Sequence, residues 1–97
     1  MRTFDDLVFK NHPNGLGGKM AQMKLKNGYT ISVVGGKGLY GNGINSFEVA
    51  IFDRQGEFVQ LQDHDSVLGY QSKDDVTNII QDYDNKPNLS FDLWTKY

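Results

Sequence analysis

Two runs of alternating apolar and polar residues, joined at Asn27-Gly28, constrain this chain more than any other feature. The runs span residues 19–34, KMAQMKLKNGYTISVV. Their apolar members are Ala21, Met23, Leu25, Tyr29, Ile31 and Val33. Strict alternation predicts two strands, each with one buried and one exposed face, and the Asn-Gly pair predicts a β-hairpin between them.

The length of the turn decides which residues of this hairpin share a face. A two-residue turn would place Leu25 opposite Thr30, so that each apolar side chain would lie across from a polar one. A three-residue loop over 26–28 instead pairs Leu25 with Tyr29 and brings the apolar set to one face. The remaining pairs are then Met23 with Ile31 and Ala21 with Val33. We predict this loop, a type I turn and bulge in which Gly28 takes the left-handed conformation.

A second hairpin is predicted around the loop Arg54-Gln55-Gly56. A three-residue loop again keeps the apolar residues of the two strands on one face. The expected apolar pairs are Ile51 with Val59 and Val49 with Leu61. The same register sets Phe52 opposite Phe58 on the other face as an aromatic cross-strand pair. Because this other face also carries apolar side chains, we expect something to cover it.

A helix is predicted to begin after Ser72, whose side chain is suited to cap the free amides of the first turn. Asp74 and Asp75 would lie in that turn, where the helix dipole favours negative charge. An apolar stripe follows at i, i+3, i+4 and i+7, formed by Val76, Ile79, Ile80 and Tyr83. The helix should end near Asp84, ahead of Pro87.

The remaining segments complete the predicted fold. A short strand is expected around Leu7 to Lys10, and the alternation in LSFDLW, residues 89–94, predicts a last strand. The fold class is therefore α+β: a mostly antiparallel twisted sheet of about five strands, with one helix from the C-terminal half packed on one face. Residues 1–97 are expected to form a single domain.

Composition narrows the classes of function. The chain has no cysteine, which excludes a disulfide framework, a thiol nucleophile and thiolate metal ligands. It contains no long apolar run and no signal peptide, so we expect a soluble, cytoplasmic protein with no membrane partner. The net charge of −2 does not indicate a dedicated nucleic-acid-binding protein.

The glycine-rich segment 35–46, GGKGLYGNGINS, is the candidate contact surface for a partner. We expect it to be the most mobile part of the ordered chain, because its glycines offer few side chains that could hold it to the core. The candidate partner-binding residues are Lys37, Leu39, Tyr40, Asn42 and Ile44. Tyr40 combines a large ring with a hydroxyl, which is typical of interface anchors. In the alternative interpretation Leu39 and Ile44 only pack under the edge of the sheet.

Residues 36–41 also match the pattern G-x-G-x-x-G of nucleotide-binding loops. That fingerprint requires a helix immediately after the loop, whereas residues 47–52 are predicted to form a strand. A nucleotide-binding enzyme therefore ranks last among the functions, and we expect no enzyme, no cofactor and no metal. Asp63-His64-Asp65 is interpreted as a solvated loop, because adjacent side chains on an extended chain point in different directions.

A nucleic-acid-binding surface is the alternative to a protein-binding one. Lys24 and Lys26 would lie on the polar face of the first hairpin, where lysines can contact phosphates. Stacking on bases also requires exposed aromatic rings, and those of this hairpin are predicted to face the core.

Three segments resemble a family of small, largely uncharacterised proteins encoded by tailed bacteriophages. They are FDDLVFKNHPNGLGG (4–18), LKNGYTISVVGG (25–36) and LGYQSKDDVTNII (68–80). The shared pattern consists of F-x-x-H-P and G-G, an N-G-Y hairpin and a helix containing D-V. The resemblance covers residues 4–84 and carries no catalytic residue.

The resemblance implies a phage origin and the bacterial cytoplasm as the place of action. The first function that we expect is therefore stoichiometric binding of a host or phage protein. Inhibition of a host defence complex, as by an anti-CRISPR protein, is one concrete form of it.

Overall fold

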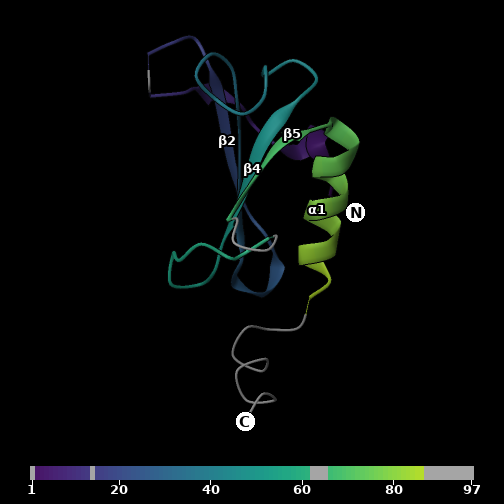
Figure 1. The fold of residues 1–97 in the computed structure, drawn as a ribbon. Coiled ribbons are helices and arrows are strands. Elements are labelled where there is room, and N and C mark those ends of the chain that lie inside the picture. Colours follow the sequence, from purple (N-terminus) through teal and green to yellow (C-terminus); the bar gives the residue numbers. More distant parts are fainter. Residues whose placement is uncertain (1, 14, 62–65, 87–97) are drawn as a thin grey trace.

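The computed structural model describes residues 2–13, 15–61 and 66–86. They form one sheet with a helix against one of its faces (Figure 1). In chain order the elements are η1 (Phe4–Asp6), β1 (Lys10–Asn11), β2 (Lys19–Lys24), η2 (Lys26–Gly28), β3 (Thr30–Gly35), β4 (Phe47–Phe52), β5 (Val67–Gln71) and α1 (Lys73–Asp84). The predicted α+β class is confirmed.

Every strand pairs antiparallel with the next strand along the chain, so the sheet order is β1-β2-β3-β4-β5. In the first hairpin Ala21 lies opposite Val33 and Met23 opposite Ile31. The backbone amide of Leu25 donates to the carbonyl of Tyr29 at 2.8 Å. The three-residue loop is therefore confirmed, and with it the burial of Tyr29 on the core side.

The conformation of the turn differs from the predicted type I turn. Gly28 has a positive φ of 89° as expected, but Asn27 is also left-handed, with φ 66°. The reason lies in the helix that ends beside the turn. The side-chain amide of Asn27 donates to the backbone carbonyls of Asp84 and Lys86 and so satisfies groups that the end of a helix leaves free.

The second hairpin follows its predicted register only near the loop. Phe52 bridges Phe58, with ring centroids 4.7 Å apart, and the amide of Val59 donates to the carbonyl of Ile51. Further along, the predicted pairing of Val49 with Leu61 is wrong, because Val49 pairs with Leu68 of β5. The segment after Arg54-Gln55-Gly56 therefore pairs with β4 near the loop, at Phe58 and Val59. The rest of this edge of β4 pairs with β5, a strand that was not predicted from the sequence.

The core lies between the sheet and α1 (Figure 1). Alternate residues of the central strands and the middle of the helix are fully buried there: Ala21, Ile31, Val33, Val49, Ile51, Val76 and Ile80. Ile79 and Tyr83 pack against this cluster while remaining partly exposed. The predicted helix is confirmed, and the Ser72 side chain accepts from the amide of Asp75 at 3.0 Å.

The N-terminal segment is less extended than predicted. A 3-10 helix over Phe4–Asp6 replaces the start of the expected strand, and β1 is confined to Lys10–Asn11. Thr3 caps this 3-10 helix, and the amide of Phe4 donates to Thr77 Oγ1 at 2.9 Å, which fixes the segment to α1. Leu7 is buried, and Phe4 and Phe9 pack against the core. The predicted last strand, 89–94, lies outside the described residues.

Candidate partner-binding surface

The loop between β3 and β4 is held by its own hydrogen bonds. The amide of Gly36 donates to the carbonyl of Gly41 at 2.9 Å. The side-chain oxygen of Asn42 accepts from three successive backbone amides, those of Ile44, Asn45 and Ser46. These bonds give the segment a defined conformation, and its predicted mobility stays a prediction.

Its glycines serve close approach between backbone segments. A Cβ on Gly35 would lie 2.5 Å from the Cα of Gly43, and one on Gly41 would lie 2.6 Å from the Cα of Phe47. Both distances are shorter than any allowed contact, so larger residues would push the loop away from the sheet. The loop is therefore a packed structure that presents the few side chains it carries.

Tyr40 is the most prominent of these side chains, and it lies beside a tyrosine from β5. The ring centroids of Tyr40 and Tyr70 are 6.3 Å apart, and the two residues are 63% and 71% exposed. The amide of Tyr70 donates to the carbonyl of Tyr40 at 2.9 Å, and the amide of Tyr40 donates to Glu48 Oε1 at 3.1 Å. Backbone hydrogen bonds thus hold the two segments side by side, and each segment carries an exposed aromatic ring.

The backbone of Tyr70 is itself unusual. Its φ is +56°, a left-handed conformation that is costly for a bulky residue and is often found at functional sites. Tyr70 lies within a register shift of the β4–β5 pairing, between the pairs Phe47–Gln71 and Val49–Leu68. A Cβ on the preceding Gly69 would lie 2.9 Å from the Cβ of Tyr40. Gly69 therefore permits the close approach of the two tyrosine-bearing segments.

The five predicted partner-binding residues fall into two places. Lys37, Leu39 and Asn42 line a shallow hollow together with Tyr70, next to Tyr40. Ile44 instead lines a separate cleft beside Phe4, Phe9 and Phe47. We call Lys37, Leu39, Tyr40 and Tyr70 the tyrosine surface. Tyr70 was not among the predicted residues, because its place beside Tyr40 depends on the unpredicted strand β5.

The alternative nucleic-acid residues are exposed but lie on different elements, Lys24 at the end of β2 and Lys26 in η2. The register places Lys24 opposite Thr30 and Thr30 opposite Phe52, so these three residues form one row across the sheet. Phe58 extends the row and is 56% exposed. The second hairpin therefore supplies an exposed ring in the same row as Lys24, with Thr30 and Phe52 between them.

Two other predicted sites can be compared with the structure. The loop with the G-x-G-x-x-G pattern leads into β4, so no helix N-terminus follows it as the dinucleotide fingerprint requires. Among the described residues no group of three or more acidic or histidine side chains could hold a metal ion. Asp63-His64-Asp65 lies outside those residues.

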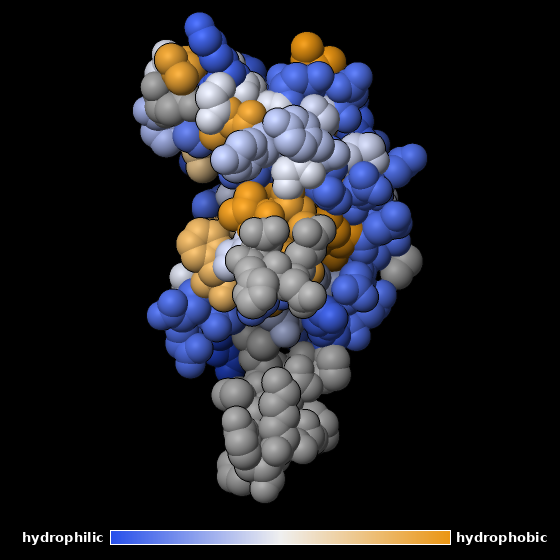
Figure 2. Space-filling view, viewed as in Figure 1, coloured by the Kyte–Doolittle hydropathy of each residue, from blue (hydrophilic) through white to orange (hydrophobic). Residues whose placement is uncertain are grey.

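The surface of the protein is mixed. Figure 2 shows an apolar area in the middle of one face, over β4 and β5, with hydrophilic surface on either side of it.

In the part of the chain that the structure describes, no helix is long and apolar enough to cross a membrane. No family model, no curated protein and no solved structure matches this chain.

Proposed function

We propose that this protein acts by stoichiometric binding to another protein through the tyrosine surface. The observation that carries the proposal is the pair of adjacent, exposed rings of Tyr40 and Tyr70. Tyrosine is enriched among residues that dominate binding energy, because it buries a large ring while its hydroxyl can still form a hydrogen bond. Because backbone hydrogen bonds already hold the two segments together, little backbone entropy is lost there on binding.

The neighbouring residues suit the same role. Lys37 is exposed at the edge of the hollow and would favour a partner with negative charge nearby. Leu39 is partly buried and extends the apolar area beside the rings. A small aromatic centre with a polar edge is the usual arrangement of a protein-binding patch.

The resemblance to tailed-phage proteins extends this proposal to a cellular context. It favours a phage accessory protein that works in the bacterial cytoplasm and binds a host protein. Inhibition of a defence complex, as by an anti-CRISPR protein, is the form of this activity that we propose to test. A binding function needs no cofactor and no catalytic group.

The test compares three tagged proteins as bait in a bacterial lysate: wild type, the double variant Tyr40→Ala/Tyr70→Asn, and the control Val8→Ala. Asparagine tolerates the left-handed conformation of residue 70 better than most residues. Val8 is 82% exposed and lies outside the surface. Quantitative mass spectrometry should find a partner retained by wild type and by the control and lost by the double variant. Equal recovery by all three proteins, with unchanged melting temperatures, would contradict the proposal.

The defence context needs its own assay. Cells with an active CRISPR system are transformed with a targeted plasmid, with or without wild-type protein. We expect the protein to raise plasmid survival and the double tyrosine variant to abolish this effect. If plasmid survival were unchanged, inhibition of that CRISPR system would be refuted. Protein binding would still be tested separately by the pull-down.

Nucleic-acid binding is the second candidate, and the row of Lys24, Phe52 and Phe58 favours it. A base can stack on an exposed ring while a lysine contacts the phosphate. Fluorescence anisotropy with a single-stranded oligonucleotide tests this candidate at low salt. Affinity should fall steeply as salt is raised and should fall further in Lys24→Ala/Lys26→Ala. No binding at low salt would eliminate the candidate.

A further inference from the structure

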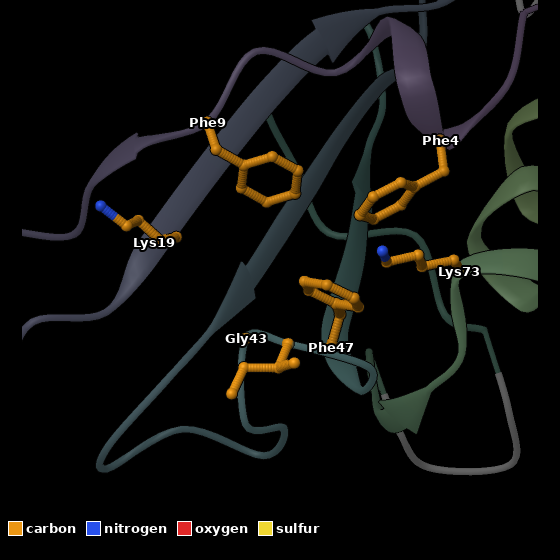
Figure 3. A pocket seen from close by; sticks show the side chains of 7 residues that line it. Phe4, Phe9, Lys19, Gly43, Phe47 and Lys73 are labelled. Carbon is orange, nitrogen blue, oxygen red and sulfur yellow. The ribbon is translucent and has the colours of Figure 1, made fainter.

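A cleft of about 290 Å³ lies beside the N-terminal segment, apart from the tyrosine surface, and three phenylalanine rings form its apolar wall (Figure 3). The ring centroids of Phe4 and Phe47 are 4.9 Å apart, those of Phe4 and Phe9 5.5 Å, and those of Phe9 and Phe47 5.8 Å. Ile44, a largely exposed residue of the loop after β3, contributes a further apolar side chain. The cleft therefore has an aromatic interior that reaches the surface.

This wall is held in place by the fold. Phe47 is the first residue of β4 and is buried in the core. Phe4 belongs to η1, which has its own capping box and whose first amide is bonded to Thr77 of α1. The cleft is thus preformed, as small-molecule sites usually are.

The charged residues that line the cleft are both lysines. The ammonium of Lys73 lies 5.6 Å from the ring centroid of Phe4, and Figure 3 shows it turned toward the rings. The ammonium of Lys19 donates to Asn11 Oδ1 at 3.1 Å, a neutral acceptor. Within the described residues neither ammonium forms an ion pair. The cleft therefore combines apolar rings with two ammonium groups that form no ion pair with a carboxylate of the described residues.

Two acidic residues follow Lys73 in the chain, but they do not line the cleft. Asp75 is engaged in the helix cap, where its carboxylate accepts from the amide of Ser72 at 3.0 Å. Asp74 is exposed in the same turn. The positive character of the cleft is therefore available to an incoming anion.

We propose that this cleft binds a small carboxylate with a flat apolar body. The body would pack against the partly exposed rings of Phe4 and Phe9, which the buried ring of Phe47 supports, and the carboxylate would pair with the ammonium of Lys73. A volume of about 290 Å³ is at the lower end of small-ligand sites and suits a body of one or two fused rings. Charge-assisted hydrogen bonds to an anion are stronger than those between neutral groups, so the anionic head should dominate selectivity. This inference is independent of protein binding at the tyrosine surface.

The test uses two ligands that differ in charge: 1-naphthaleneacetate and the neutral alcohol 1-naphthaleneethanol. Each is titrated into ¹⁵N-labelled wild-type protein, and amide shifts in two-dimensional NMR report both affinity and location. We expect the acid to bind on the order of tenfold more tightly than the alcohol. The largest shifts should fall on the residues of the cleft. Equal affinities, shifts centred elsewhere, or no saturable binding of the acid would overturn the proposal.

Two variants then test whether Lys73 supplies the positive charge that binds the carboxylate. Lys73→Gln keeps the length of the side chain and should reduce the affinity of the acid to that of the alcohol, with the affinity of the alcohol unchanged. Arg54→Gln removes one positive charge from the loop after β4 and should leave both affinities at wild-type values. A Lys73→Gln protein that still prefers the acid tenfold would refute the role of Lys73. Because Lys73 is exposed, we expect both variants to fold, and the comparison of ligands on wild type requires no variant.

Discussion

The guanidinium of Arg2 donates two hydrogen bonds to the carboxylate of Asp84, the last residue of α1, at 3.1 and 2.6 Å. The same carboxylate accepts the backbone amide of Lys26 at 2.8 Å, and Arg2 also donates to the carbonyl of Lys24. One carboxylate thus joins the N-terminal segment, the tip of the first hairpin and the end of the helix. The Asp84 side chain is only 9% exposed and that of Arg2 35%, so the bonds between these two side chains are partly shielded from water.

We expect this carboxylate to make stability depend on pH. Burial raises the pKa of Asp84, but the hydrogen bonds from Arg2 and Lys26 and the positive charges of both residues outweigh burial and lower the pKa below its ordinary value of 3.8. Since the pKa is lower in the folded protein, the stabilisation is complete above about pH 3.8. It is lost as the pH falls through the folded-state pKa.

Urea unfolding of wild type and Asp84→Asn checks this. The free energy of unfolding of Asp84→Asn should be about 2 kcal/mol lower than that of wild type at pH 7, because a neutral amide accepts weaker hydrogen bonds from Arg2 and Lys26 than a carboxylate does. The difference should shrink below pH 3.8. Asp82→Asn is the control: its side chain is 67% exposed and pairs with Lys86 at 3.5 Å. Its loss should stay within about 0.5 kcal/mol, as for most surface pairs. A pH-independent difference for Asp84→Asn would contradict the assignment.

The first hairpin gives a second prediction. Gly28 has φ 89°, a conformation that side chains disfavour, so Gly28→Ala should destabilise by about 1 kcal/mol. Lys26→Ala should cost little, because the variant keeps the backbone amide that bonds to Asp84 and loses only the weaker effect of the Lys26 charge on that carboxylate. Chemical denaturation measures both. If the two variants were equally stable, the positive φ at residue 28 would not make alanine unfavourable there, and the prediction would be wrong.

The helix gives a third prediction, which the structure makes sharper than the sequence did. Ile80 is fully buried and Ile79 only partly, although both lie on the predicted stripe. Ile80→Ala should cost about 3–5 kcal/mol and Ile79→Ala about 1–2 kcal/mol. Ser72→Ala should cost about 1 kcal/mol by removing the cap. Equal losses for the two isoleucines, measured by thermal and urea unfolding, would mean that the helix packs differently.

Local patterns predicted the parts of this fold that depend on neighbouring residues. Alternation and one turn were enough for the register of Ala21 with Val33, and a cap with an apolar stripe was enough for α1. Strand β5 was missed because Gly69 and the left-handed Tyr70 interrupt its alternation. Its pairing with β4 is a tertiary contact that no local signal contains.

The candidate site was predicted in part for the same reason. Tyr40 could be singled out from its own segment, as a large side chain among glycines. Its partner Tyr70 is 30 positions away, and only the β4–β5 register brings the two rings together. Likewise, the cleft beside Phe4, Phe9 and Phe47 joins η1, the residue before β1, and β4, whose proximity follows from packing rather than from spacing.

The last prediction concerns the loop that carries Tyr40. Because Asn42 accepts hydrogen bonds from the amides of Ile44, Asn45 and Ser46, those amides should exchange slowly with solvent. Asn42→Ala removes the acceptor and should speed their exchange by at least about tenfold, corresponding to roughly 1.4 kcal/mol of local stability. Asn42→Asp keeps an acceptor oxygen at the same place and should preserve slow exchange.

Hydrogen exchange followed by NMR distinguishes the two views of this loop. Fast exchange of all three amides in wild type would indicate a mobile connector, and the fixed presentation of Tyr40 would then have to be abandoned. Slow exchange in wild type and in Asn42→Asp, lost in Asn42→Ala, would instead establish that the side chain of Asn42 organises the loop. In that case Asn42→Ala should also weaken partner binding without lowering the melting temperature, because the hydrogen-bonded loop holds Tyr40 beside Tyr70 while the core lies elsewhere.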